Sequence, residues 1–174
     1  MYDTFLNTIG SESVMSRVRD VWTSYYAGRA ISYRQQQGIP HGSGSMAVLV
    51  MELVDSEAGG VIFTRDPRDG TEQIIVNVAL GLGEGVVSGV AQSDSFTLDS
   101  DSLEIISRNV IDKERMVVPG TTGSIGREPV PAEKRSVAAL SDEQILAVAQ
   151  IAMTIKETAG DDRDIEFAVD GETV

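Results

Sequence analysis

The chain has 174 residues, a length that suits one domain or one lobe of a larger domain. Its 27 acidic and 14 basic residues give a net charge of −13 without a basic, aromatic-interleaved stripe, so we expect no nucleic-acid partner. The absence of cysteine excludes disulfide scaffolds, thiolate zinc sites and cysteine nucleophiles. No apolar run approaches the roughly 18 residues of a membrane span, and the amino terminus lacks a signal pattern, so we expect a cytoplasmic protein without a membrane partner.

The first predicted element is a helix over residues 11–37. An apolar set recurs at three- and four-residue spacing, which places it on one helical face: Val14, Val18, Val21/Trp22 and Tyr25. Ser11 is a suitable residue for the N-cap of this helix.

Aromatic residues and a single histidine mark the next stretch. Trp22, Tyr25 and Tyr26 are expected to pack in the core rather than to form a binding platform. A flexible Gly/Ser loop follows at 41–45. Its His41 is the only histidine of the chain and has no serine–carboxylate motif beside it. We expect it to be a surface residue rather than a catalytic base.

Three apolar, β-branched runs predict strands in the middle of the chain, at residues 46–54, 60–64 and 72–78. A polar turn, 65–70, joins the last two of them. Arg65 in this turn can meet a phosphate, or it can pair with Asp66 or Asp69 and fix the turn. The sequence leaves both possibilities open.

A glycine-rich loop follows the third strand, with four glycines among residues 81–89 and Glu84 as its one carboxylate. A dinucleotide-binding fingerprint fails because Val86 and Ser88 occupy the positions of its third glycine, and a P-loop fails because no lysine is near. Two interpretations stay open. The glycines let the backbone approach a ligand, or they belong to an ordinary strand–loop–helix connection.

The second half of the chain alternates strands, an irregular connection and a helix. Strands at 95–98 and 103–110 are predicted to pair across a turn, and residues 119–136 are predicted to be a long irregular connection. Ser141 and Gln144 form a capping box for a helix that runs to about Ala159 and stops at Gly160.

The last predicted strand covers residues 164–169. Strand periodicity places Asp164 and Glu166 on the face opposite Ile165 and Phe167. Two carboxylates so placed can hold Mg²⁺ together with phosphate oxygens. The alternative is an edge strand with a solvated acidic face, and nothing supports a glycosidase pair. An Asp-Gly hairpin signal comes next, and we expect its returning strand to be cut short.

Three ordered segments, 60–67, 77–89 and 164–171, resemble the nucleotide-binding domain of phosphoenolpyruvate synthase and pyruvate phosphate dikinase. This is an ATP-grasp fold shared with rifamycin phosphotransferases. Residues 2–7 and 22–30 are similar to the same domain, so the resemblance covers almost the whole chain. It implies an α+β fold, an ATP-grasp-like lobe with a mainly antiparallel sheet and packed helices.

The resemblance also implies a site for ATP and Mg²⁺. It places an adenine-contacting hinge at 51–54, with Met51, Glu52 and Val54 as nucleotide contacts. It places Glu84 beside the nucleotide and its metal. Asp164 and Glu166 fall on the acidic motif that faces Mg²⁺-ATP, as phosphoryl transfer requires.

Several departures from the family pattern shape the expected function. Many relatives carry glutamine where Met51 stands, and the family's first lobe and its Gln-x-Arg strand would lie outside residues 1–174. We therefore expect part of an ATP-grasp domain that works with the remaining domains of a parent enzyme or with a partner chain. It would hold Mg²⁺-ATP for phosphoryl transfer to a histidine on another domain and would be inactive alone. The alternatives are a non-catalytic, ATP-grasp-derived binding or assembly module and an unrelated acidic α/β binding domain.

Overall fold

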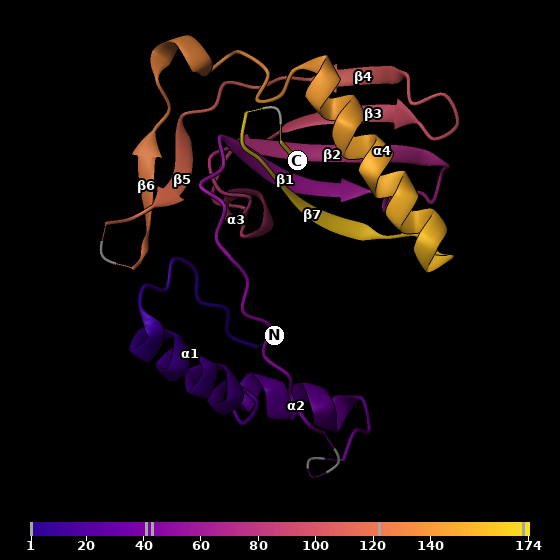
Figure 1. Cartoon of the computed structure of the whole chain (residues 1–174). Coiled ribbons are helices and arrows are strands. Elements are labelled where there is room, and N and C mark those ends of the chain that lie inside the picture. Colours follow the sequence, from indigo (N-terminus) through magenta and orange to yellow (C-terminus); the bar gives the residue numbers. More distant parts are fainter. Residues whose placement is uncertain (1, 41, 43, 122, 172) are drawn as a thin grey trace. The chain divides into compact units, whose positions relative to one another are not determined.

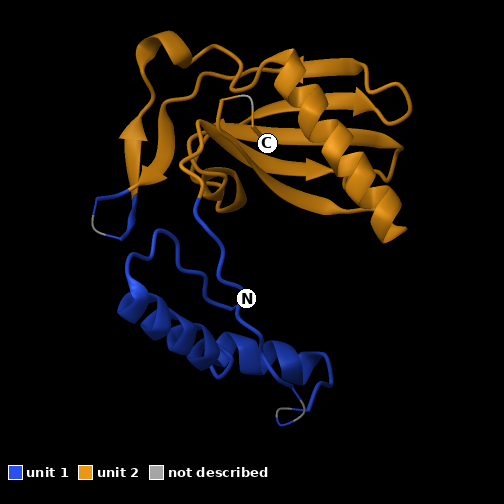
Figure 2. Cartoon of the chain, viewed as in Figure 1, with its two compact units in different colours: residues 1–53, 120–125 blue, residues 54–119, 126–174 orange. Residues whose placement is uncertain are grey.

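The computed structural model describes residues 2–40, 42, 44–121, 123–171 and 173–174 (Figure 1). These residues divide into two units (Figure 2). Unit 1 comprises residues 1–53 and 120–125, and unit 2 comprises residues 54–119 and 126–174. His41, expected on the surface, lies outside the residues that the structure describes.

Unit 1 contains two helices where the sequence predicted one. They are α1 (Ser11–Ser24) and α2 (Gly28–Gln36). Between them, the amides of residues 25–27 bond to the carbonyls three residues earlier, and Ala27 then adopts an extended conformation, which ends the first helix. The predicted cap was also wrong, because Gly10 is the N-cap of α1 and Ser11 is already helical.

The aromatic residues of unit 1 differ in burial. Tyr25 is buried as predicted, and the Arg34 guanidinium lies 3.9 Å from the centre of its ring. Trp22 and Tyr26 are 49% and 71% exposed, so their prediction as core residues was wrong. The helix break at residues 25–27 changes the face on which Tyr26 and later residues lie, which the continuous helical pattern did not anticipate. Trp22 precedes the break, and its half-exposed indole donates to the Met46 carbonyl at 3.1 Å.

The predicted strand at 46–54 was also wrong. These residues belong to no strand, and no backbone–backbone hydrogen bond of residues 47–54 occurs within the described part of the chain. Leu49, Val50 and Met51 are exposed. A β-branched, apolar composition favours a strand only where a neighbouring strand takes up its backbone groups, and none does so here.

Unit 2 is built on a five-stranded sheet with the order β4-β3-β2-β1-β7, antiparallel at every pairing. The predicted strands at 60–64, 72–78, 95–98, 103–110 and 164–169 are thereby confirmed, with small changes of their bounds. The strands are β1 (Ala58–Phe63), β2 (Gln73–Leu80), β3 (Asp94–Asp99), β4 (Ile105–Asn109) and β7 (Asp164–Val169). With the helices, they make the expected α+β fold.

One helix, α4 (Asp142–Ala159), crosses one face of this sheet (Figure 1). The predicted capping box is confirmed, because the Ser141 hydroxyl accepts from the Gln144 amide and the Gln144 side chain accepts from the Ser141 amide. Gly160 ends the helix in a left-handed conformation. The core lies between helix and sheet and includes Ile62, Val76, Phe96, Leu98, Ile145, Val148 and Val169.

The connection predicted to be irregular, residues 119–136, contains one strand of a second, two-stranded sheet and begins at the end of the other. This sheet pairs β5 (Arg115–Pro119) with β6 (Ile125–Pro129), and a short 3₁₀ helix (Ala132–Lys134) follows. The prolines and glycines of this stretch masked the strands in the sequence pattern. Among the described residues, no helix is long and apolar enough to cross a membrane.

A buried ion pair joins the segment between β4 and β5 to the main sheet. The Lys113 ammonium lies 2.7 and 2.9 Å from the two carboxylate oxygens of Asp94, and both side chains are almost fully buried. The same carboxylate accepts from the backbone amides of Ile111 and Ala139. Four donor contacts therefore compensate for the burial of this charge.

Candidate functional site

The glycine loop, residues 81–89, contains α3 (Glu84–Val87), a single turn of helix whose first residue is Glu84. Gly81 has φ +80°, and a Cβ atom at this position would lie 2.2 Å from the Val117 carbonyl oxygen of β5. The amide of Leu82 donates to that carbonyl at 2.8 Å, and the Gly81 amide donates to the backbone carbonyl of Glu57. A side chain at position 81 would therefore separate the loop from β5.

The loop also packs directly on the main sheet. A Cβ atom on Gly59 of β1 would lie 2.7 Å from the Gly83 nitrogen and 3.2 Å from the Phe167 carbonyl oxygen of β7. The backbone before Glu84 is thus in contact with two strands. These glycines bring the loop close to the protein's own backbone, which supports the connection interpretation for Gly81 and Gly83.

The two carboxylates of β7 lie where the alternation predicted. Ile165 and Phe167 pack against the core beneath α4, whereas Asp164 and Glu166 are exposed on the opposite face. In the register between β1 and β7, Glu166 is opposite Val61 and Ala168 is opposite Gly59. This confirms the predicted division of the strand into an apolar and an acidic face.

The loop that carries Glu84 lies on this acidic face of the sheet. Gly59 alternates with Ala58, which belongs to the core on the α4 side, so Gly59 and its contact Gly83 lie on the other side. The structure therefore brings the segment of Glu84 to the same face as Asp164 and Glu166, within one unit.

The donor chemistry of this face suits a hard divalent cation. Within the described residues, no ion pair engages the side chains of Glu84, Asp164 or Glu166, so their oxygens stay available. No group of three or more acidic or histidine residues in the described part forms a complete metal cage. Two carboxylates fit Mg²⁺, which keeps several waters and takes further oxygens from phosphates.

The predicted adenine hinge falls at the boundary of the two units. Met51 and Glu52 belong to unit 1 and Val54 belongs to unit 2. Met51 is 75% exposed and Val54 is 44% exposed, and neither lies in a strand. Their role as nucleotide contacts stays a prediction.

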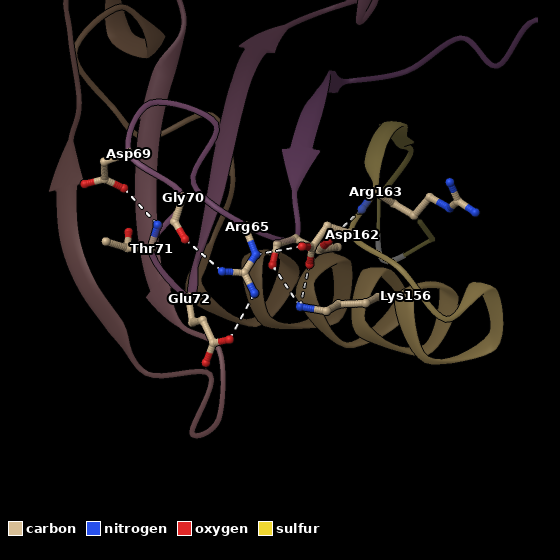
Figure 3. A network of polar contacts seen from close by, with 9 residues as sticks. Arg65, Asp69, Gly70, Thr71, Glu72, Lys156, Asp162 and Arg163 are labelled. Atoms are coloured by element: carbon tan, nitrogen blue, oxygen red, sulfur yellow. Dashed lines mark hydrogen bonds and ion pairs between the residues drawn. The ribbon is translucent and has the colours of Figure 1, made fainter.

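Arg65 lies at the centre of a polar network just after β1 (Figure 3). Its guanidinium donates to Asp162 at 2.6 Å, to the Gly70 carbonyl at 2.8 Å and to Glu72 at 2.9 Å. The partners named from the sequence were wrong, because Asp66 pairs with Arg68 instead. With three acceptors, the guanidinium fixes the connection between the strands. This was the alternative to a phosphate contact.

The carboxylate of Asp162 receives a second cation. Lys156, in the last turn of α4, lies 2.8 Å from its other oxygen. The hydrogen bonds from Lys156 and then from Arg65 hold the pKa of Asp162 below its usual value. The hydrogen bond to Asp162, followed by that to Glu72, raises the pKa of Arg65. Sequence reasoning missed this pairing because Arg65 and Asp162 are 97 positions apart.

Comparison with known proteins identifies the family of the chain. All 174 residues match one protein family, the AMP/ATP-binding domain of pyruvate phosphate dikinase. The chain belongs to this family. It is therefore a member of an ATP-binding domain family.

Relatives of the pyruvate phosphate dikinase ATP-binding domain include phosphoenolpyruvate synthases. The chain is 36% identical over 167 residues to a probable phosphoenolpyruvate synthase of Methanocaldococcus jannaschii, with 95% of the chain and 14% of the relative covered. It is 37% identical to the corresponding protein of Methanothermobacter thermautotrophicus, with 96% of the chain and 24% of the relative covered.

A rifampicin phosphotransferase of Bacillus cereus is similar as well. It is 30% identical over 173 residues, which cover 99% of the chain and 20% of the relative. Across these three relatives, the chain spans 14% to 24% of the relative's length. The relatives are longer proteins in which this domain is one part.

Proposed function

We propose that this chain forms one wall of an Mg²⁺-ATP site in a phosphotransferase related to phosphoenolpyruvate synthase. The observation that carries the proposal is the shared face of Asp164, Glu166 and the loop that leads to Glu84, in a member of an ATP-binding family. In this proposal, residues 1–174 are part of an ATP-grasp domain. The phosphoryl group would pass to a histidine on another domain of the parent enzyme or on a partner chain.

Each carboxylate has a distinct place in the proposed site. Asp164 and Glu166 supply the oxygens that hold Mg²⁺ from the sheet, and Glu84 faces the nucleotide and its metal from the start of α3. When bound, Mg²⁺ supplies charge neutralisation at the phosphates. The rigid contact of the glycine loop with β1 and β7 holds Glu84 in a fixed place relative to the strand of the other two carboxylates.

In this proposal Met51, Glu52 and Val54 are the adenine-contacting hinge, as the family resemblance implies. Within the described residues, the backbone of this segment makes no backbone–backbone hydrogen bond, so it offers hydrogen bonds to a base without a requirement for glutamine at position 51. Binding without turnover is expected for the isolated chain. No lysine or arginine of the described residues pairs with the three carboxylates, and phosphoryl transfer needs cations on the transferred group.

Titration calorimetry with Mg²⁺-ATP tests the proposal on the 174-residue chain. We expect weak binding that Glu84→Gln, Asp164→Asn and Glu166→Gln each reduce several-fold. Asp101→Asn is the matched control, because it removes an exposed carboxylate from the β3–β4 turn. An affinity for Mg²⁺-ATP that none of the three substitutions changes would contradict the proposal. Robust ATP hydrolysis that Glu166→Gln abolishes would contradict it as well.

A non-catalytic binding or assembly module is the second candidate. It is favoured by the exposure of Met51 and its neighbours, which form no strand in the described structure. The same titration separates the two candidates. The absence of any heat of binding at millimolar ATP supports the module and contradicts the nucleotide site.

A further inference from the structure

The entry into β7 is held by β1 through a pair of hydrogen bonds. The Thr64 amide donates to the Arg163 carbonyl at 3.0 Å, and the Arg163 amide donates to the Thr64 hydroxyl at 2.8 Å. Thr64 is fully buried. The first bond continues the backbone ladder one step beyond the pairing of Phe63 with Asp164, and the side-chain hydroxyl supplies the acceptor for the second. The backbone of Asp164 therefore follows directly from a fixed residue.

Two cationic side chains bind Asp162, the residue that precedes Arg163. Arg65 donates to one carboxylate oxygen of Asp162 and Lys156 lies beside the other, so Asp162 is bound from the β1–β2 connection and from α4 (Figure 3). Lys156 also reaches the Thr64 carbonyl at 3.4 Å. The short segment 162–163 is thus attached to two elements immediately before the strand begins.

The position of this attachment determines which side chains face which side of the sheet. A shift of one residue in the pairing of an edge strand exchanges its two faces. In β7 such a shift would turn Asp164 and Glu166 toward the core and Ile165 and Phe167 toward solvent. The attachment at 162–163 opposes local slippage and fraying at the first residue of the strand, which is Asp164.

We propose that Arg65 is a positioning residue for the carboxylates of Asp164 and Glu166, acting through Asp162. This inference rests on the proposed Mg²⁺-ATP site. Arg65 uses its three donor groups on Asp162, Gly70 and Glu72, so it fixes the strand connection and the entry into β7 at once. It holds the metal-binding face in its register and does not contact the metal.

The test compares Arg65→Met with Arg68→Met in the 174-residue chain. Arg68 is the matched control because it lies in the same turn and pairs with Asp66 rather than with the entry to β7. ATP affinity is measured with and without Mn²⁺, a spectroscopic substitute for Mg²⁺. We expect Arg65→Met to weaken the Mn²⁺-dependent part of binding about tenfold, as for other groups that orient metal ligands. Affinity for ATP without metal stays unchanged.

Amide hydrogen exchange gives a readout independent of the nucleotide. Arg65→Met should raise the exchange rate of the Arg163 and Ile165 amides, and Arg68→Met should leave it unchanged. Arg65→Lys should restore part of the protection, because a lysine keeps one contact but not the fork of three. Should Arg65→Met fail to fold, Asp162→Asn tests the same attachment from the other side.

The outcomes separate this inference from the function on which it rests. Unchanged exchange and unchanged Mn²⁺-dependent affinity in Arg65→Met would overturn the positioning role. If Asp164→Asn with Glu166→Gln leaves Mn²⁺-ATP affinity intact, the proposed metal site itself is wrong. Equal losses of affinity with and without Mn²⁺ would show a general structural defect and also contradict the inference.

Discussion

Gly81 and Gly89 share a backbone conformation but differ in their surroundings. Both have positive φ, +80° and +68°. A Cβ atom at Gly81 would collide with the Val117 carbonyl oxygen, whereas a Cβ atom at Gly89 would meet open space. The pair therefore separates the cost of a left-handed backbone from the cost of a steric clash.

We expect Gly89→Ala to destabilise the fold by about 1 kcal/mol, the strain of an alanine in this backbone region. Gly81→Ala should cost about 1–3 kcal/mol more, because the loop must also move away from β5. Urea denaturation of both variants measures the difference. Equal losses would mean that the contact between Gly81 and Val117 contributes nothing to the packing of the glycine loop.

For single residues, strand alternation was a better guide than nearness in the sequence. The exposure of Asp164 and Glu166 followed from strand alternation, because each residue's face depends only on its neighbours. The partners of Arg65 did not follow from the sequence, since the nearest acidic residues, Asp66 and Asp69, are not its partners. An ion pair over 97 positions depends on the tertiary fold.

The helix α4 is the element whose ends the sequence predicted best. Its signals are local, because the capping box spans Ser141 to Gln144 and the stop is the single residue Gly160. The segments 46–54 and 115–129 show the opposite case. The first has strand-forming residues but no neighbouring strand, and the second forms strands despite its prolines, so pairing decided both.

Ser141→Ala should destabilise unit 2 by about 1 kcal/mol, the usual value of an N-cap side chain. The Gln144 amide would lose its acceptor at the start of the helix that covers the core. Ser141→Thr keeps a hydroxyl at the cap and serves as the control. Thermal unfolding compares the two, and identical midpoints for alanine and wild type would show that the cap makes no net contribution.

Across the whole molecule, apolar burial is unevenly divided between the two units. In the described residues of unit 1, Tyr25 and Ala30 are the buried hydrophobic side chains, whereas unit 2 has the continuous core between α4 and the sheet. Local opening needs little free energy where few apolar contacts are lost. The two units should therefore differ in local stability.

Hydrogen exchange checks this difference. We expect the amides of α1 and α2 to be at least about tenfold less protected than those of β2, corresponding to about 1.4 kcal/mol in opening free energy. Mass spectrometry of peptides from the intact chain resolves the two regions. Equal protection in the helices and in β2 would show that the two units open together.

The Asp94 carboxylate binds both ends of a long segment of the chain. The Lys113 ammonium at the start of this segment and the Ala139 amide at its end both donate to Asp94. The Lys113 amide also donates to the Arg135 carbonyl. The entropy of closing a loop grows only slowly with its length. Changes of length between β5 and β6 should therefore be tolerated in evolution only where three conditions hold. Val117 stays beside Gly81, both ends reach Asp94, and the Gly120 and Ser124 carbonyls keep their hydrogen bonds from the Asn7 side chain.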